Sequence, residues 1–300
     1  MDERQKKELT RVLSNDVHFS CPMGPYTTFR VGGKAEALCA VKGLLQLKEL
    51  LSFASKENLP YLVVGKGSNV LVKDRGLKGL ALLLKGELEE VEEQEGKIHA
   101  GGGLGLAGLV RFSQEKGIAG LEFLAGIPGT AGGAVAMNAG AWGKSTGEVV
   151  TVVEILTADG ERVTLNRSEL QFGYRRAVLP IGSVVVKTQF MGTPDRPEAI
   201  GERIRDYLER RKAGQPLDYP SAGSVFKNPP QDYAGRLIES VGLKGTRVGG
   251  AMISDRHANV IVNVGGASAE DILALMETAR QRVREQTGID LEPEIKVVGD

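Results

Sequence analysis

Cysteine and histidine are scarce in this sequence, and both scarcities exclude particular kinds of site. The two cysteines, Cys21 and Cys39, have no metal-ligand spacing and are too few for a disulfide framework, which indicates a reducing compartment. Three scattered histidines argue against a zinc site. We therefore expect no bound metal.

An excess of charge and a long apolar run are also missing. Lysine plus arginine and aspartate plus glutamate balance at 38 each, so no net field would attract nucleic acid or an anionic membrane. No apolar run reaches membrane-spanning length, and the first residues, MDERQKKELTRVL, are charged where a signal peptide would be apolar. We expect a cytoplasmic protein of about two domains in which local sites carry any recognition of anions.

Glycine is abundant instead, and it is concentrated in Gly126–Gly143, GIPGTAGGAVAMNAGAWG. Glycine lets the main chain approach a ligand closely, so the run as a whole favours a nucleotide or cofactor cradle. For single glycines, a tight turn or close helix packing stays the alternative. Gly65–Asn69 is a second candidate after a short buried strand, and a hairpin turn explains it equally well.

Two common nucleotide-binding motifs are nearly present, and both are rejected. The segment Gly103–Gly108 has GxGxxG spacing, but the chain lacks the repeated βαβ pattern of a doubly wound sheet. Gly143–Ser145 resembles the end of a Walker A loop, yet Asn138 stands where its first glycine belongs. A strand is expected at Glu148–Leu156, where that motif needs a helix. Phosphoryl transfer is therefore disfavoured.

Hydrophobic periodicity and turn residues predict an alternation of helices and strands, which indicates an α+β protein. The final segment, Leu291–Lys296, is expected to be a strand with two carboxylates, either catalytic or on a solvated edge. Gly288 is expected to end the last helix. Helices are predicted near 2–14, 44–54, 106–116, 200–211 and 272–283, and strands near 37–41, 61–64, 80–84, 97–100, 151–157, 162–165, 184–189 and at the end of 251–263.

Several polar residues are candidates for substrate contacts. Arg175 beside Tyr174 would suit a carboxylate, although the residues alone favour a surface arginine. Ser224 lacks the glycine of a nucleophile elbow, and His257 stays open as a partner. The basic run Arg210–Lys212 fits either compensation of a helix dipole or a diphosphate clamp.

Seven stretches, taken together and in order, resemble the UDP-N-acetylenolpyruvoylglucosamine reductase family. The resemblance implies a two-lobed FAD-binding region of the vanillyl-alcohol-oxidase type, with lobes at 1–78 and 79–192, and a smaller substrate-binding domain at 193–300. The seven stretches are Thr27–Gly33, Val64–Val72, Gly120–Gly143, Phe172–Arg175, Ser221–Pro229, His257–Asn263 and Leu291–Val298.

The activity implied by the resemblance is NADPH-dependent reduction of UDP-N-acetylglucosamine enolpyruvate to UDP-N-acetylmuramate, a step of peptidoglycan precursor synthesis. Noncovalent FAD would carry the hydride, and NADPH would be the co-substrate. The expected partners are these small molecules, with no nucleic acid or membrane, and we expect a monomer.

The resemblance also implies roles for individual residues. Ser224 would deliver a proton to the substrate's C2, while Arg175 and a protonated Glu294 would stabilise the enolate. Substrate contacts are expected at Tyr174, Lys212 and Asn228. Cofactor contacts are expected at Gly65, Gly67, Ser68, Asn69, Pro128, Gly129, Gly133, Ala134, Asn138, Gly140 and Ala141.

Some residues depart from the family pattern. Ala177 stands where many members carry a serine, and Gly143–Thr146 is unusual. The short segment between Val186 and Pro197 has no room for the loop that closes over substrate in one branch, so the chain resembles the short branch. An alcohol oxidase or dehydrogenase of the same superfamily and a non-catalytic nucleotide-sugar-binding protein stay as alternatives.

Overall fold

The computed structural model describes residues 1–300 and separates into two compact units, each built from three stretches of chain. Met1–Phe19, Ala37–Lys66 and Gly79–Arg210 form the first unit. Ser20–Glu36, Gly67–Lys78 and Arg211–Asp300 form the second. The sequence predicted two FAD-binding lobes, 1–78 and 79–192, and a substrate-binding domain, 193–300. These bounds describe which ligand each part binds. The packing of the chain does not show that, so they stay predictions. None of the helices combines the length and apolar character needed to cross a membrane.

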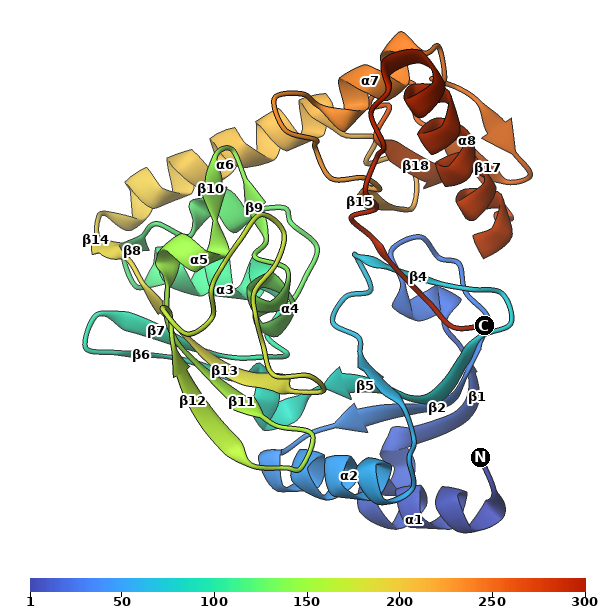
Figure 1. Ribbon diagram of the computed structural model, residues 1–300. Coiled ribbons are helices and arrows are strands. Elements are labelled where there is room, and N and C mark those ends of the chain that lie inside the picture. The colour runs from blue at the N-terminus through green and yellow to red at the C-terminus, as the bar shows by residue number, and fades with distance from the viewer. The chain divides into compact units, whose positions relative to one another are not determined.

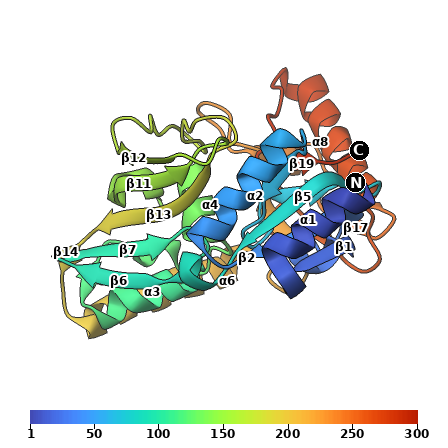
Figure 2. The same cartoon turned by 90° about the horizontal axis from the view of Figure 1, so that it is seen from below.

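A five-stranded antiparallel sheet is the centre of the first unit. Helices α3 (Leu106–Glu115) and α4 (Ala131–Ala136) lie on one face of this sheet, as Figure 1 shows. Helix α6 (Pro197–Gly214) comes after the strands of this sheet in the chain. Apolar side chains from both layers, Phe123 and Phe190 among them, are buried between them. The strand order, visible in Figure 2, is β12 (Arg162–Asn166), β11 (Val150–Leu156), β13 (Val184–Met191), β7 (Lys97–Gly101) and β6 (Val91–Gln94).

A second sheet of four strands carries helices α1 (Glu3–Leu13) and α2 (Leu44–Lys56). Helix α1 begins at a capping box between Asp2 and Gln5, and its apolar positions face a core shared with α2. Strand β3 pairs parallel with β5, which brings the loop after β3 beside the end of β5. The order is β1 (Val17–Pro22), β2 (Lys34–Val41), β5 (Leu77–Leu84) and β3 (Tyr61–Val63).

The second unit packs two helices, α7 (Ala234–Ser240) and α8 (Ala269–Thr287), against an antiparallel sheet. Helix α8 begins at a capping box of Ser268 and Asp271 and ends at Gly288, whose φ of 73° confirms the predicted cap. Strand β19 (Lys296–Val298) pairs parallel with β4 (Val70–Val72). The sheet order is β15 (Ser221–Ser224), β18 (Val260–Asn263), β17 (Ala251–Ile253) and β16 (Arg247–Val248).

Most predicted elements are confirmed, but the strand expected at Glu148–Leu156 begins too early. A short helix, α5 (Thr146–Val149), precedes β11. Ser145 and Glu148 form a capping box at its start, a signal that the apolar pattern obscured. The helix is only one turn long, and strand β11 follows it directly.

The strand predicted at Leu291–Lys296 is wrong for most of its length, since β19 begins only at Lys296. Pro293 has no N–H with which to continue a ladder, so this segment makes a single antiparallel bridge with Phe226. Two backbone hydrogen bonds flank the bridge. The N–H of Lys227 donates to the Glu292 carbonyl, and the N–H of Glu294 donates to the Val225 carbonyl, both at 2.8 Å.

Candidate active site

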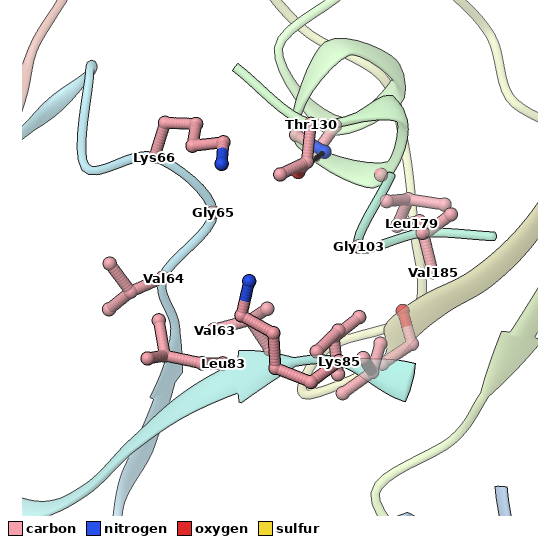
Figure 3. Close-up of a pocket in the computed structure, with 17 residues that line it drawn as sticks. Val63, Val64, Gly65, Lys66, Leu83, Lys85, Gly103, Thr130, Leu179 and Val185 are labelled. Carbon is pink, nitrogen blue, oxygen red and sulfur yellow. Dashed lines mark hydrogen bonds between the residues drawn. The ribbon is translucent and has the colours of Figure 1, made fainter. Parts of the chain in front are cut away.

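A pocket in the first unit opens beside the loop that follows β3 (Figure 3). It contains about 660 Å³ of space not filled by protein atoms, part of it open to solvent. Apolar and glycine residues make up most of its wall, which is the usual character of a ligand pocket. The wall comprises Val63, Val64, Gly65, Lys66, Leu83, Leu84, Lys85, Gly102, Gly103, Thr130, Gly132, Gly133, Ala136, Leu179, Ser183, Val184 and Val185.

Two glycines are required by close approaches in this wall. A Cβ atom at Gly65 would lie 2.8 Å from Thr130 Oγ1, and one at Gly132 would lie 3.0 Å from the Gly102 carbonyl oxygen. The N–H of Gly132 donates to that same carbonyl at 2.9 Å. Gly65 therefore packs against the Thr130 side chain and Gly132 against the Gly102 backbone, and a Cβ at either position would be crowded.

One buried side-chain polar atom of the pocket residues has no partner within the protein. Ser183 Oγ is buried and makes no hydrogen bond, although a buried hydroxyl normally finds a partner. Thr130 Oγ1, by contrast, accepts the N–H of Gly133 at 3.3 Å and caps helix α4. The orphan hydroxyl indicates that something outside the chain completes this wall.

The turn that carries Tyr174 and Arg175 also belongs to the first unit. Gly173 and Arg176 exchange backbone hydrogen bonds, which places the two candidates at the tip of a tight turn. Arg175 adopts a φ of 55°, a conformation uncommon for a residue with a side chain and typical of functional sites. Its guanidinium carbon lies 5.4 Å from the centre of the Tyr174 ring, which is 54% exposed.

Asn138 connects this turn to the glycine-rich stretch. Its side-chain amide donates to the Gly173 carbonyl at 2.8 Å, and its oxygen accepts the N–H of Gly147, also at 2.8 Å. The side chain is only 7% exposed, so these bonds are shielded from water. The predicted contact of Asn138 with the cofactor stays a prediction, while its two hydrogen bonds tie the turn at Gly173 to the segment at Gly147.

The other predicted cofactor residues of the glycine-rich stretch have varied places. Gly133 lines the pocket, Ala134 lies in the core, and Pro128 is exposed. The Gly129 carbonyl accepts the N–H of Leu106 at 3.0 Å. Strand β9 (Gly140–Ala141) pairs with β10 (Lys144–Ser145) in a hairpin. Contacts with a cofactor at these positions stay predictions.

In the second unit, the structure brings Ser224 and Glu294 to neighbouring segments. Ser224 ends strand β15 and is paired in register with Val260. The next residue, Val225, donates its N–H to the Asn259 carbonyl at 2.9 Å and accepts the Glu294 N–H at 2.8 Å. The segments that carry Ser224, Asn259 and Glu294 are distant in sequence, and all three therefore meet at the backbone of Val225.

Asn259 strengthens this junction with its side chain. It is 2% exposed, and its amide both accepts from the Phe226 N–H at 3.0 Å and donates to the Phe226 carbonyl at 2.8 Å. A buried two-point contact of this kind fixes the local backbone. The resemblance covered Asn259, but sequence reasoning assigned it no role.

The predicted cofactor residues Gly67, Ser68 and Asn69 belong to the same unit. The Gly67 carbonyl accepts the N–H of Thr28 at 3.1 Å, and Ser68 is half-buried. Asn69 Nδ2 donates to the Glu294 carbonyl at 3.2 Å, while the Asn69 carbonyl accepts the N–H of Lys296 at 2.9 Å. Asn69 therefore supports the segment that carries Glu294.

Two substrate candidates of this unit also have structural partners. Lys212 is exposed, and its carbonyl accepts from Arg256 Nη1 at 3.3 Å. The Asn228 oxygen accepts the N–H of Ala234 at 3.1 Å, at the start of α7. Arg211, beside Lys212, is 8% exposed, and burial lowers the pKa of its guanidinium. Whether these side chains contact a ligand stays a prediction.

His257, left open as a possible partner of the serine, contacts the backbone of Asn259 in the structure. Its Nδ1 accepts the N–H of Asn259 at 3.2 Å. Burial lowers the pKa of the ring, Lys244 lowers it further, and hydrogen bonding within the residue and Glu239 act in the opposite direction. A neutral imidazole that supports the backbone is the better description.

Sequence reasoning missed several residues of the pocket. Lys66 lies within the Gly65–Asn69 candidate but was given no role, and nothing in the sequence pointed to Lys85 or Ser183. Gly103 is the first glycine of the rejected dinucleotide motif, and Gly102 immediately precedes it. Rejection of a doubly wound fold is confirmed because β7 pairs antiparallel with both neighbours, yet these two glycines line the pocket.

Comparison with known protein families gives two matches that together cover most of the chain. Residues 35–166 match an FAD binding domain. Residues 215–298 match the C-terminal domain of UDP-N-acetylenolpyruvoylglucosamine reductase. Both agree with the seven stretches found in the sequence.

Individual relatives extend over nearly the full length. UDP-N-acetylenolpyruvoylglucosamine reductase of Moorella thermoacetica is 46% identical over 97% of this chain and 94% of its own. The protein of the same name from Syntrophus aciditrophicus is 43% identical over 98% and 96%. A crystal structure of the Thermus caldophilus enzyme is 40% identical with a TM-score of 0.81, covering 93% of this chain and 97% of that one.

A more distant structure bears on the fold alone. p-Cresol methylhydroxylase has a TM-score of 0.50 and 11% identity, covering 98% of this chain and 66% of its own. Together with the matched FAD binding domain, this likeness confirms the predicted α+β fold of the vanillyl-alcohol-oxidase type.

Proposed function

Because the chain belongs to the UDP-N-acetylenolpyruvoylglucosamine reductase family, we propose that it reduces UDP-N-acetylglucosamine enolpyruvate to UDP-N-acetylmuramate with NADPH. The observation that carries this proposal is the similarity to enzymes of that name along almost the whole chain. The product is a precursor of peptidoglycan. The reaction is an oxidation and reduction, and it requires a hydride carrier.

FAD is that carrier, and the pocket of the first unit fits it. The unpartnered Ser183 hydroxyl and about 660 Å³ of unfilled space, part of it open to solvent, are compatible with a ligand. Gly65 and Gly133 of the pocket are among the residues that would hold it. Bound FAD would supply the transfer of hydride from NADPH to the enolpyruvyl double bond.

The chain's own groups control the substrate's charge and protons. Arg175 and protonated Glu294 donate hydrogen bonds to the substrate carboxylate, where negative charge grows as the double bond is reduced. A carboxylic acid stays protonated near neutral pH only where its surroundings raise its pKa. Ser224 then gives its hydroxyl proton to C2. Its placement matters more than its acidity, because the carbanion it meets is a strong base.

The remaining parts of the proposal concern substrate contacts and organisation. Tyr174, Lys212 and Asn228 would contact the sugar nucleotide. The segment between β13 and α6 is short and contains only the two-residue strand β14 (Thr193–Pro194). It has no room for a long loop that could close over the substrate, which supports membership of the short branch. The proposal includes a cytoplasmic monomer with FAD-binding lobes at 1–78 and 79–192 and a substrate domain at 193–300.

The test combines a spectrum with an assay. The purified protein, reconstituted with FAD, is expected to show flavin absorbance and to oxidise NADPH only when the enolpyruvyl sugar nucleotide is present. Failure to retain flavin would contradict the proposal. Reduction by an alcohol, without oxidation of NADPH that depends on the sugar nucleotide, would instead favour an oxidase of the same superfamily. Binding of the nucleotide without turnover would favour a non-catalytic binder.

A further inference from the structure

We propose that Lys66, assisted by Lys85, recognises the diphosphate of the cofactor by charge, an inference that rests on the proposed FAD site. Both lysines line the pocket of the first unit. No residue that lines this pocket is acidic, so the two positive charges are not balanced within its wall. A ligand with negative charge at that position would supply the balance.

The geometry of Lys66 prepares it for such a ligand. It follows Gly65, and its Cε atom lies 3.5 Å from the position that a Cβ on Gly105 would occupy, so the lysine stem passes beside the Gly105 backbone at ordinary contact distance. Lys66 is exposed and makes no ion pair or hydrogen bond through its side chain within the protein. Figure 3 shows its ammonium group directed to the open side of the pocket, opposite Thr130.

Lys85 approaches from another element. It follows strand β5, and its ammonium group also points into the opening in Figure 3. Unlike Lys66, it forms an ion pair with Glu89 at 2.8 Å. Part of its charge is therefore compensated before a ligand arrives, and we expect it to contribute less than Lys66.

The rest of the pocket suits the adenosine that is joined to the diphosphate in FAD. Its interior is mainly aliphatic, with Val64, Leu84 and Val185 in the wall, and the buried Ser183 hydroxyl is the orphan polar atom. An apolar space with one unsatisfied hydroxyl accepts a flat heterocycle with hydrogen-bonding edges, such as a purine. Lys66 and Lys85 would therefore bind the diphosphate, and the uncharged interior beside them would hold the adenosine.

The test measures FAD affinity rather than turnover. Full-length holoprotein is diluted, and the fluorescence of released FAD gives the dissociation constant for wild type, Lys66→Gln, Lys85→Gln and Lys66→Arg. Lys7→Gln, on the exposed face of α1, is the matched control. We expect Lys66→Gln to weaken FAD binding about tenfold at low salt and Lys85→Gln about threefold. Lys66→Arg should stay within about twofold of wild type.

Salt separates a charge effect from a packing effect. At 1 M salt the screening length is about 3 Å, so the difference between Lys66→Gln and wild type should largely disappear. The proposal is overturned if Lys66→Gln and Lys7→Gln bind FAD equally well, if the defect persists unchanged at high salt, or if Lys66→Arg fails to restore binding. Absence of FAD from the wild type would instead overturn the proposed function itself.

Discussion

The backbone N–H of Glu294 donates to the carbonyl of Val225, the residue after Ser224, at 2.8 Å. Ser224 and Glu294, which are proposed to act on the same substrate, therefore lie on two neighbouring, hydrogen-bonded segments of the chain. Asn259 fixes the other side of that backbone through its buried contacts with Phe226. Main-chain bonds therefore fix the backbone positions of Ser224 and Glu294 relative to each other, and the side-chain rotamers set the distance between the hydroxyl and the carboxyl.

Ser224→Ala should separate the two half-reactions. Reduction of the flavin by NADPH needs no proton from Ser224, so its rate should stay near that of wild type. Reoxidation by the enolpyruvyl substrate should slow by roughly three or more orders of magnitude, in the range of other catalytic groups that transfer protons. Stopped-flow absorbance measures both rates. Ser221→Ala, in the same strand, is the control, and equal slowing of both half-reactions would refute the assignment.

The neighbouring carboxylates Glu292 and Glu294 form a matched pair. Glu292 is exposed and forms an ion pair with Lys227, whereas Glu294 is half-buried. Glu294→Gln should slow reoxidation by about 100-fold or more, because an amide is a weaker donor to the developing negative charge. Glu292→Gln should leave both half-reactions close to wild type. The same stopped-flow experiment checks this, and similar rates in the two variants would remove Glu294 from the mechanism.

Asn138→Asp tests whether the glycine-rich stretch positions Arg175. Aspartate keeps the acceptor for the Gly147 N–H and tolerates the φ of 41°, but it cannot donate to the Gly173 carbonyl. A displaced turn should lower kcat/KM by about 10- to 100-fold while FAD stays bound. Steady-state kinetics and the flavin spectrum report the two effects separately. Unchanged kinetics would show that the bond has no such role.

His257 should make the protein sensitive to acid. Burial lowers its pKa below the ordinary value of 6.5, so the unfolded chain binds a proton more readily than the folded one. The free energy of unfolding should therefore fall as the pH drops below about 6.5. His257→Asn keeps an acceptor for the Asn259 N–H and should reduce this fall, whereas the exposed His18→Asn should not. Urea unfolding at pH 7.5 and pH 5.5 measures the difference.

Local sequence signals predicted the elements well where one signal dominated. The periodic leucines correctly predicted helix α2, and Gly288 correctly predicted the end of helix α8. The segment before β19 failed because its alternation looked like a strand, while Pro293 limits it to one bridge. The fold type came from resemblance, since pairing order in antiparallel sheets depends on contacts between segments far apart in sequence.

The candidate site could be predicted only in part, for a similar reason. Ser224, Arg175 and Glu294 were found through their motifs. Lys85 and Ser183 lie in no motif, and only the parallel pairing of β3 with β5 and the position of β13 bring them to the pocket. Asn138 and Asn259 were within recognised stretches, but their roles depend on partners that no spacing rule indicates.

The parallel pair of β4 with β19 has a consequence for synthesis of the chain. Residues 70–72 leave the ribosome long before residues 296–298, their partner strand. At about 5 to 20 residues per second, β4 waits on the order of 10 to 45 seconds for it. During that interval its backbone groups are open to water, chaperones or another nascent chain. Completion of the second unit therefore depends on residues 296–298, and loss of these residues would leave β4 without this partner.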